Sequence, residues 1–168
     1  MLEQKMKIAL NQQINAELWS SYLYLSMSYD MANKGYEGMA QWFTLQAKEE
    51  FMHATRFMQF IGGRDEKVAL MPIAEVKQEW NTPKEAFEDT LKHEKIVTEK
   101  IHKLMDLAIE LKDYATQNML KWFIDEQVEE EDSVRKILEK LKMVENNPAA
   151  MFALDQTLGQ RQSADGQN

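Results

Sequence analysis

The segment Glu50-Phe-Met-His53 places a carboxylate and an imidazole three residues apart. On an α-helix, side chains at this spacing lie on the same face, so the two groups can bind one metal ion. Gln46, Phe57 and Phe60 continue this face at helical spacing, and the two aromatic residues indicate that it points into the protein. The segment therefore predicts a metal-binding pair on the buried face of a helix.

Composition favours a helical protein with one domain. The chain has 168 residues, of which only 6 are Gly and 3 are Pro, and this length is sufficient to bury a full core. Ala, Leu, Glu, Lys, Gln and Met dominate, and all of them are strong helix formers. We therefore predict an all-α fold, with a domain over residues 1–160 and a polar, disordered tail over residues 161–168.

Charge and cysteine content limit the functions open to the chain. The net charge of −8 disfavours binding to nucleic acid and suits the attraction of cations, although many proteins are acidic for solubility alone. There is no Cys, which excludes disulfides, iron–sulfur clusters, thiolate zinc sites and cysteine nucleophiles. A bound metal would therefore have oxygen and nitrogen ligands. The first residues form no apolar signal segment, and no stretch approaches the length of a membrane span, so we expect a cytoplasmic protein.

Four long segments have the periodicity of packed helices. Hydrophobic residues recur at steps of three and four over about residues 5–34, 39–61, 83–108 and 114–144. This spacing is typical of helices whose apolar stripes face one another in a bundle. The predicted architecture is a four-helix bundle.

Local signals mark the helix ends. Thr82 before Pro83 is a strong helix start, and Asp113 can cap the fourth helix. Gly35 suits a left-handed C-terminal cap of the first helix, and Gly38 would close the short turn after it. A fifth, short helix is expected over residues 148–158, and it must pack on the bundle or on a neighbouring subunit because it is too short to be stable alone.

Residues 63–81 have no helical period. A structureless segment of this length is uncommon inside a compact domain unless it has a role. A helix of about 28 residues is about 42 Å long, and nineteen extended residues, at about 3.3 Å each, reach further than that. We therefore expect this segment to cross the length of the bundle and to start the third helix parallel to the second.

Each long helix interrupts its apolar stripe near mid-length with an acid. These acids are Glu17, Glu50, Glu94, and the pair Glu126 and Glu130. Burying one unpaired carboxylate costs several kcal/mol, and burying several together adds repulsion between them. No Lys or Arg lies on these stripes, so we expect the neutralising cations to come from outside. A pair of metal ions supplies about four positive charges at one point, and carboxylates with few nitrogens suit iron or manganese.

Each of these residues also has an ordinary structural interpretation. A single Glu on a helix usually faces solvent, and a single buried His is more often hydrogen-bonded than metal-bound. The metal interpretation is preferred because all the acids fall in register with hydrophobic residues. Tyr24 could donate a hydrogen bond to a ligand, give an electron during oxygen chemistry, or be an ordinary core tyrosine. His93 and His102 are expected on the surface, and the 12 Met residues in the core or at interfaces.

The combination resembles the bacterial non-haem ferritins over about residues 1–160. The residues that carry the resemblance are Glu17 with Tyr24, Glu49 and Glu50 with His53, Glu94, and the run of Glu126, Gln127, Glu129 and Glu130. The resemblance implies that Glu17, Glu50 and His53 hold a first iron. Glu50 would bridge to a second iron held by Glu94 and Glu130, with Gln127 close by. A third iron site would be formed by Glu49, Glu126, Glu129 and Glu130, and Tyr24 would be a redox-active neighbour.

The resemblance also implies an activity and an assembly. The protein would be a ferroxidase that oxidises Fe(II) with O2 or H2O2 at a di-iron centre, and it would store ferric oxyhydroxide inside a homo-oligomeric 24-subunit cage. The short fifth helix would lie near the four-fold axes of that cage. Haem is not expected, because Phe51 stands where bacterioferritins have their haem-ligand Met, and Met52 is rotated by about 100° around the helix. The acidic cluster that lines an iron channel in many animal ferritins is replaced here by Gln117-Asn-Met-Leu-Lys121.

Three classes of function remain open from the sequence. The first is an iron-storing ferroxidase cage. The second is a DNA-protecting mini-ferritin, which is disfavoured because the acids form a full set within one chain and because a fifth helix is expected. The third is a structural or interaction bundle without metal, which is disfavoured by the cost of burying the acids.

Overall fold

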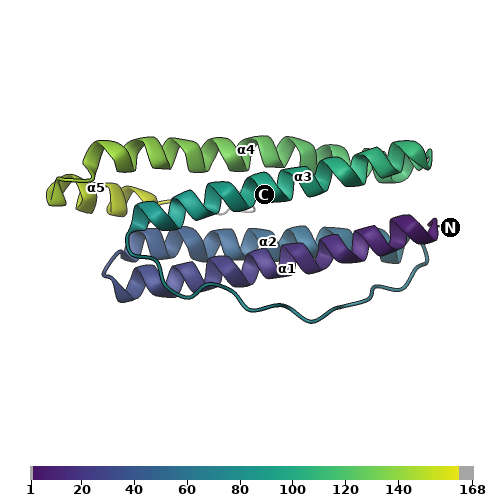
Figure 1. Ribbon diagram of the computed structural model, residues 1–168, viewed down its shortest axis with the longest axis horizontal. Helices are drawn as coiled ribbons and strands as arrows, with labels where there is room; N and C mark the ends of the chain where they lie inside the picture. Colours follow the sequence, from purple (N-terminus) through teal and green to yellow (C-terminus); the bar gives the residue numbers. More distant parts are fainter. Residues whose placement is uncertain (1, 163–168) are drawn as a thin grey trace.

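Four long helices and one short helix form the secondary structure of the computed structural model, which describes residues 2–162. They are α1 (Gln4–Asn33), α2 (Glu37–Gly63), α3 (Pro83–Glu110), α4 (Tyr114–Val144) and α5 (Pro148–Leu158). The helix pairs α1–α2 and α3–α4 are antiparallel hairpins that lie side by side as a bundle (Figure 1). The predicted all-α bundle is confirmed, and the ends of the helices differ from the predicted ends by only one or two residues.

The predicted caps form the local contacts expected of them. The backbone N–H of Glu85 donates to the Thr82 hydroxyl at 3.1 Å, and Pro83 is the first residue of α3. The Asp113 carboxylate accepts from the backbone N–H of Thr116 at 3.2 Å at the start of α4. Gly35 has a φ of 85°, as a left-handed helix end requires.

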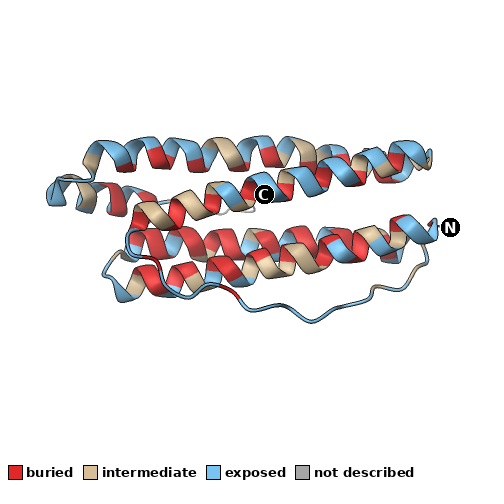
Figure 2. Ribbon diagram, viewed as in Figure 1, coloured by how far each residue is buried: buried red, intermediate tan, exposed pale blue. Residues whose placement is uncertain are grey.

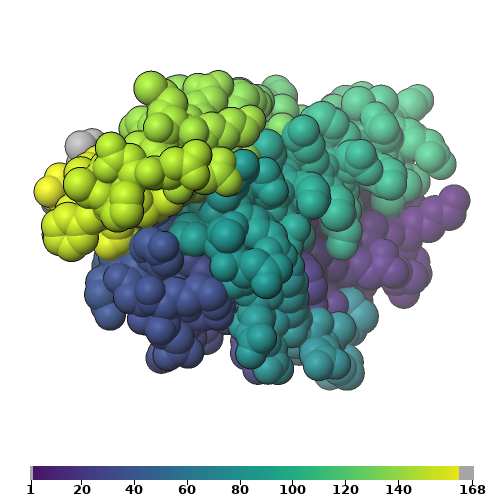
Figure 3. Space-filling view, turned by 60° about the vertical axis from the view of Figure 1, so that its left-hand side comes forward, coloured from purple at the N-terminus to yellow at the C-terminus, as the bar shows by residue number. Residues whose placement is uncertain are grey.

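The predicted role of Gly38 is wrong, because this residue lies inside α2 and is a contact point for α5. A Cβ atom at Gly38 would lie 1.7 Å from the backbone oxygen of Asp155. The Asp155 carboxylate accepts hydrogen bonds from the backbone N–H groups of Gly38 at 3.1 Å and Met39 at 2.8 Å, so α5 supplies the side chain that satisfies the start of α2. Figure 3 shows this end of the molecule, where α5 and the end of α4 lie beside the region of the α1–α2 turn.

The segment between α2 and α3 runs the length of the bundle along α1, as predicted (Figure 1). Polar side chains of α1 hold its backbone at intervals. The successive contacts are Asn11 with Ala69, Asn15 with Met71 and Pro72, Trp19 with Glu75, Ser26 with Lys77, and Asp30 with Trp80. Because the segment returns the chain to the end where α2 starts, α3 runs parallel to α2.

Buried residues recur along each of the four long helices, between exposed ones (Figure 2). The core that they form is divided into two hydrophobic clusters by a polar layer at mid-length. One cluster, which includes Phe43 and Phe87, fills the end that α5 covers. The other, which includes Phe57 and Phe123, fills the opposite end. On every long helix the acid predicted from the sequence lies between the two clusters. In the part of the chain that the structure describes, no helix is both long enough and apolar enough to cross a membrane.

Candidate metal centre

Glu17, Glu50 and His53 meet in the polar layer. Glu17 comes from α1, and the other two come from successive turns of α2. One oxygen of each carboxylate and one ring nitrogen of His53 all lie within 4.8 Å of one another. The residues are nearly inaccessible, with exposed fractions of 1%, 1% and 5%. The first predicted group of ligands therefore lies together in the protein interior.

A second group consists of His53, Glu126 and Glu130, whose ligand atoms also lie within 4.8 Å of one another. Glu130 is buried, whereas the side chain of Glu126 is 26% exposed. The two groups share His53, so carboxylates of α1, α2 and α4 surround one imidazole. The resemblance implies Glu130 in both the second and the third iron site and Glu126 in the third alone, with His53 in neither. In the structure, both of these acids approach His53.

Glu94 on α3 is buried and is held by two hydrogen-bond donors. The Tyr24 hydroxyl donates to one carboxylate oxygen, and the Gln127 amide donates to the other at 3.1 Å. Of the three sequence-based interpretations of Tyr24, the hydrogen bond to a predicted ligand is therefore present. Gln127 acts here as a donor to Glu94, and its amide also reaches the Thr98 hydroxyl at 3.2 Å.

Gln46 connects the acids of α2 and α4. Its amide donates to Glu130 at 2.8 Å and to Glu50 at 3.3 Å. The helical period identified Gln46 only as part of the buried helix face. Its position four residues before Glu50 on the same face was the signal that could have identified it as a partner of the ligands.

Burial and mutual repulsion raise the pKa of each acid in this layer. The pKa of Glu17 is raised first by burial and then by the charge of Glu50, and the pKa of Glu50 is raised by burial and by the charges of Glu94 and Glu130. The pKa of Glu94 is raised by burial. Burial and then the charge of Glu94 raise the pKa of Glu130 to about 8. Without cations, these carboxyl groups therefore keep their protons at a pH at which ordinary glutamates have lost them.

The layer also contains one polar atom without a partner. The first oxygen of Glu17 accepts from Gln13 at 2.8 Å, whereas the second is buried and has no hydrogen-bond partner among residues 2–162. A buried acceptor in this state costs about 1–3 kcal/mol. A cation between Glu17, Glu50 and His53 would satisfy it, and oxygen ligands with one nitrogen suit iron.

The outer acids of the predicted third site have different surroundings. Glu49 is half-buried on α2 and forms an ion pair with Arg161, whereas Glu129 is exposed on α4. Arg161 belongs to the segment predicted as a disordered tail, and its side chain contacts Gln46 and Trp42 of α2. Residues 163–168 of that segment lie outside the described residues.

His93 is half-buried rather than exposed, contrary to the prediction, whereas His102 is exposed as predicted. The His93 ring lies 5.1 Å from the Trp19 ring, centroid to centroid, and one ring nitrogen lies 2.7 Å from the Ser20 hydroxyl oxygen. Burial lowers the pKa of His93 to about 4, so this imidazole is neutral near pH 7. The sequence could not show this, because His93 lies beside the predicted stripe of α3 and is covered by α1.

Comparisons with known proteins agree with this arrangement. A family profile described as "Ferritin-like domain" matches residues 8–144. The chain is 40% identical to a bacterial non-haem ferritin of Bacteroides fragilis, over 96% of this chain and 100% of that protein. It is 35% identical to a probable bacterial non-haem ferritin-like protein of Haemophilus influenzae, over 95% and 96% of the two chains. The crystal structure of an open-pore ferritin from the archaeon Archaeoglobus fulgidus superimposes with a TM-score of 0.95 at 42% identity, over 96% and 100% of the two chains. With its acids gathered around one histidine at the middle of a four-helix bundle, this chain belongs to the ferritin family.

Proposed function

We propose that this protein stores iron, and that it oxidises Fe(II) within each subunit before ferric oxyhydroxide is deposited inside a 24-subunit cage. The observation that carries the proposal is the buried layer in which Glu17, Glu50 and His53 approach within 4.8 Å of one another. In the proposal, these three residues bind the first ferrous ion. Glu50 also contacts a second ion together with Glu94 and Glu130, with Gln127 holding Glu94. The outer acids Glu49, Glu126 and Glu129 bind a third ion with Glu130.

The electrostatics of the layer supply the driving force for ion binding. Because their pKa values are raised, these carboxyl groups hold protons near neutral pH that an arriving cation displaces, so iron binding releases protons. Two ferrous ions give two electrons to dioxygen, which takes up two protons to become hydrogen peroxide. The peroxide can in turn accept electrons from two further ferrous ions. The carboxylates favour the ferric product because its charge is higher. Hydrolysis of that product then releases it towards the cavity of the cage.

Tyr24 is proposed to assist this step in two ways. Its hydroxyl donates to Glu94, and this bond holds the carboxylate in place. Burial and the charge of Glu94 raise the pKa of Tyr24, so the phenol stays protonated at neutral pH. A protonated tyrosine beside an oxidised metal pair can supply one electron and pass its proton to Glu94.

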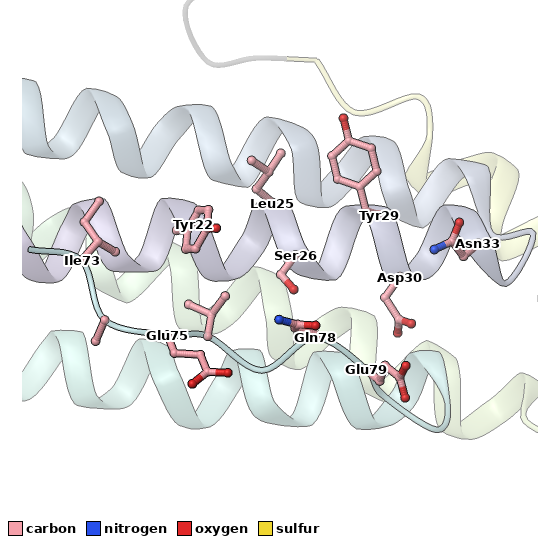
Figure 4. A pocket seen from close by; sticks show the side chains of 12 residues that line it. Tyr22, Leu25, Ser26, Tyr29, Asp30, Asn33, Ile73, Glu75, Gln78 and Glu79 are labelled. Carbon is pink, nitrogen blue, oxygen red and sulfur yellow. The ribbon is translucent and has the colours of Figure 1, made fainter.

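An apolar surface on α1 supports self-association. Tyr22, Leu25 and Tyr29 on α1 and Ile73 on the crossover segment are exposed. These residues line a groove of 710 Å³ between the helix and the crossover, with Glu75 and Glu79 at its edge (Figure 4). Exposed apolar patches of this kind mark interaction sites in soluble proteins. We propose that a second copy of the chain covers this groove in the cage.

Native mass measurement after loading with Fe(II) in air tests the proposal. The expected result is a 24-subunit species that gains mass as mineral forms. Stopped-flow absorbance measures the oxidation rate in parallel for Glu50→Ala and His53→Ala, which should lose rapid oxidation while they keep the wild-type assembly. Each removes one group from the shared cluster around His53.

The matched control is Glu139→Ala, which removes an exposed carboxylate of α4 far along the helix from the polar layer. This variant should oxidise iron at the wild-type rate. Unchanged oxidation kinetics in Glu50→Ala would remove the catalytic assignment. A wild-type protein that assembles without gaining mineral would contradict iron storage.

A further inference from the structure

Arg161 reaches back from the end of α5 to the outer side of the metal centre. Its guanidinium group lies over the Trp42 ring, 4.6 Å from the centroid, and forms an ion pair with Glu49. It also donates to the side-chain oxygen of Gln46 at 2.9 Å. The Arg161 and Glu49 side chains are 23% and 17% exposed, so the pair is shielded from solvent on most sides. Three different contacts on one helix define a single position for this guanidinium.

The contact with Gln46 determines which way that amide points. A guanidinium group has only donors, and ionised carboxylates have only acceptors. Because Arg161 donates to the oxygen of Gln46, the amide nitrogen must point to the opposite side, where it donates to Glu130 and Glu50. Arg161 is therefore linked through one side chain to two residues of the proposed iron site.

The position of Arg161 depends on how α5 is attached. The Asp155 carboxylate accepts from the first N–H groups of α2, and Gly38 leaves room for the α5 backbone. Arg161 lies three residues beyond the end of α5, so the same attachment brings the guanidinium to Glu49. Glu49 and Arg161 are 112 residues apart in the chain, and α5 is what brings them together.

We propose that Arg161 is a cation built into the chain that occupies the outer iron position, and that an iron ion bound by Glu49 must displace it. The inference rests on the proposed function, because it assumes that Glu49 is an outer iron ligand. While Arg161 is in place, it neutralises Glu49 and donates to Gln46, whose amide donates to Glu50 and Glu130. When a third ion arrives, the guanidinium moves off Glu49. Arg161 is thus a positioning residue. The two inner ions bind while it contacts Glu49, and the outer ion binds only as it leaves.

Anaerobic calorimetric titration of the full-length apoprotein with Fe(II) tests this inference. In Arg161→Gln, the inner ions should bind as in the wild type, whereas the outer ion should bind on the order of tenfold more tightly because a competing charge is gone. Arg161→Lys keeps the charge but loses the planar fork, so its outer affinity should lie between those of the other two proteins. The matched control is Arg135→Gln, which removes a half-exposed arginine paired with Asp132 on α4 and should bind like the wild type.

Tryptophan fluorescence supplies a second measurement that does not depend on oxidation. In the wild type, the outer ion should change the emission of Trp42 as the guanidinium leaves its ring, and this change should be absent in Arg161→Gln. Trp42→Phe assigns the signal among the 4 Trp residues. If Arg161→Gln does not assemble, Arg161→Lys still decides the question through its outer affinity.

The outcomes separate the inference from the proposed function. If the wild-type protein binds Fe(II) at the inner pair but Arg161→Gln has the same or weaker outer affinity, the displacement of Arg161 is wrong and the ferroxidase proposal stands. If the wild-type protein binds no Fe(II) at Glu50 and His53, the proposed function itself fails. If Arg161→Gln binds the outer ion more tightly and the inner ions as the wild type does, this result supports both the displacement of Arg161 and the proposed function.

Discussion

The Tyr24 hydroxyl on α1 donates a hydrogen bond to the carboxylate of Glu94 on α3, across 70 residues of chain and at the centre of the bundle. This bond lowers the pKa of Glu94 against the opposing effect of burial. Tyr24 thereby makes Glu94 easier to deprotonate and ready to accept a metal ion.

We therefore expect Tyr24→Phe to slow the initial oxidation of Fe(II) by about tenfold, since a hydrogen bond to a charged group is worth about 1.5–3 kcal/mol. Without the hydroxyl, Glu94 holds its proton more tightly and the second ion binds more weakly. Stopped-flow absorbance measures the rate. Tyr114→Phe is the control, because Tyr114 is 73% exposed at the start of α4. Equal rates for Tyr24→Phe and wild type would exclude a role for the hydroxyl.

Replacing one buried acid should stabilise the metal-free protein. Burial, and then the charges of Glu94 and Glu130, raise the pKa of Glu50, so folding of the apoprotein must protonate this group, and Glu50→Gln removes that cost. We expect the unfolding temperature of the apo form to rise by about 4 °C, which corresponds to roughly 1–2 kcal/mol in a chain of this size.

The iron-loaded form should show the opposite order, with the wild type more stable than Glu50→Gln, because the variant has lost a ligand. Calorimetric scans of apo and loaded samples measure both effects. The exposed-site variant Glu139→Gln should match the wild type in both states. An apo Glu50→Gln that melts below the wild type would show that the carboxyl group stabilises the fold without metal.

The stability of the apoprotein should fall as the pH rises from 6.5 to 8. The pKa of the Glu130 carboxyl group rises from its ordinary value of 4.5 to about 8 on folding. In this window the unfolded chain has released the proton while the folded protein keeps it, so a higher pH favours unfolding. The pKa of His93 falls from 6.5 to about 4 on folding, so this residue has the opposite effect, which is strongest below pH 6.5 and fades as the pH rises through the window.

Unfolding temperatures of the apoprotein across this window test the sign, and Glu130→Gln should reduce the slope. Loading with iron should remove it, since bound ions replace the protons. A flat or rising profile for the wild-type apoprotein would mean that the acids of the polar layer are already ionised.

A methyl group at Gly38 should detach α5. In Gly38→Ala the new Cβ would lie 1.7 Å from the backbone oxygen of Asp155, and backbone cannot move aside as a flexible side chain can. We expect a loss of about 1–3 kcal/mol in stability and faster amide exchange over residues 148–162, measured by mass spectrometry. Gly62→Ala is the control, because a Cβ there has no heavy atom within 4 Å. Slow exchange of α5 in Gly38→Ala would show that the helix is held elsewhere.

The residues of the site were predictable one helix at a time. Glu17, Glu50 and Glu94 each stand in a stripe of hydrophobic residues, and the helical period alone predicts that such residues face inward. The same period could not show that Glu126 and Glu130 meet at His53, or that Tyr24 and Gln127 hold Glu94. Those contacts depend on the axial register between helices, which the packing of whole side chains determines.

His93 is a residue whose burial the helical period did not predict. It lies next to the stripe of α3, so its spacing predicts exposure, but Trp19 and Ser20 of α1 cover it. Gly38 was predicted as a turn residue because it follows Gly35, whereas its function is to admit the backbone of a helix more than a hundred residues later. No local sequence pattern indicates the burial of His93 or the contact of Gly38 with α5.

The sequence by itself determined the five helices, the caps that start α3 and α4, the long crossover and the inward direction of the acids, because these depend on period, chain length and the preferences of neighbouring residues. Only the tertiary structure decided which acids share His53, that Asp155 caps α2, and that Arg161 lies on Glu49. The physical reason is that the last two contacts join residues 117 and 112 positions apart, and their geometry follows from how the helices pack against one another rather than from any local preference.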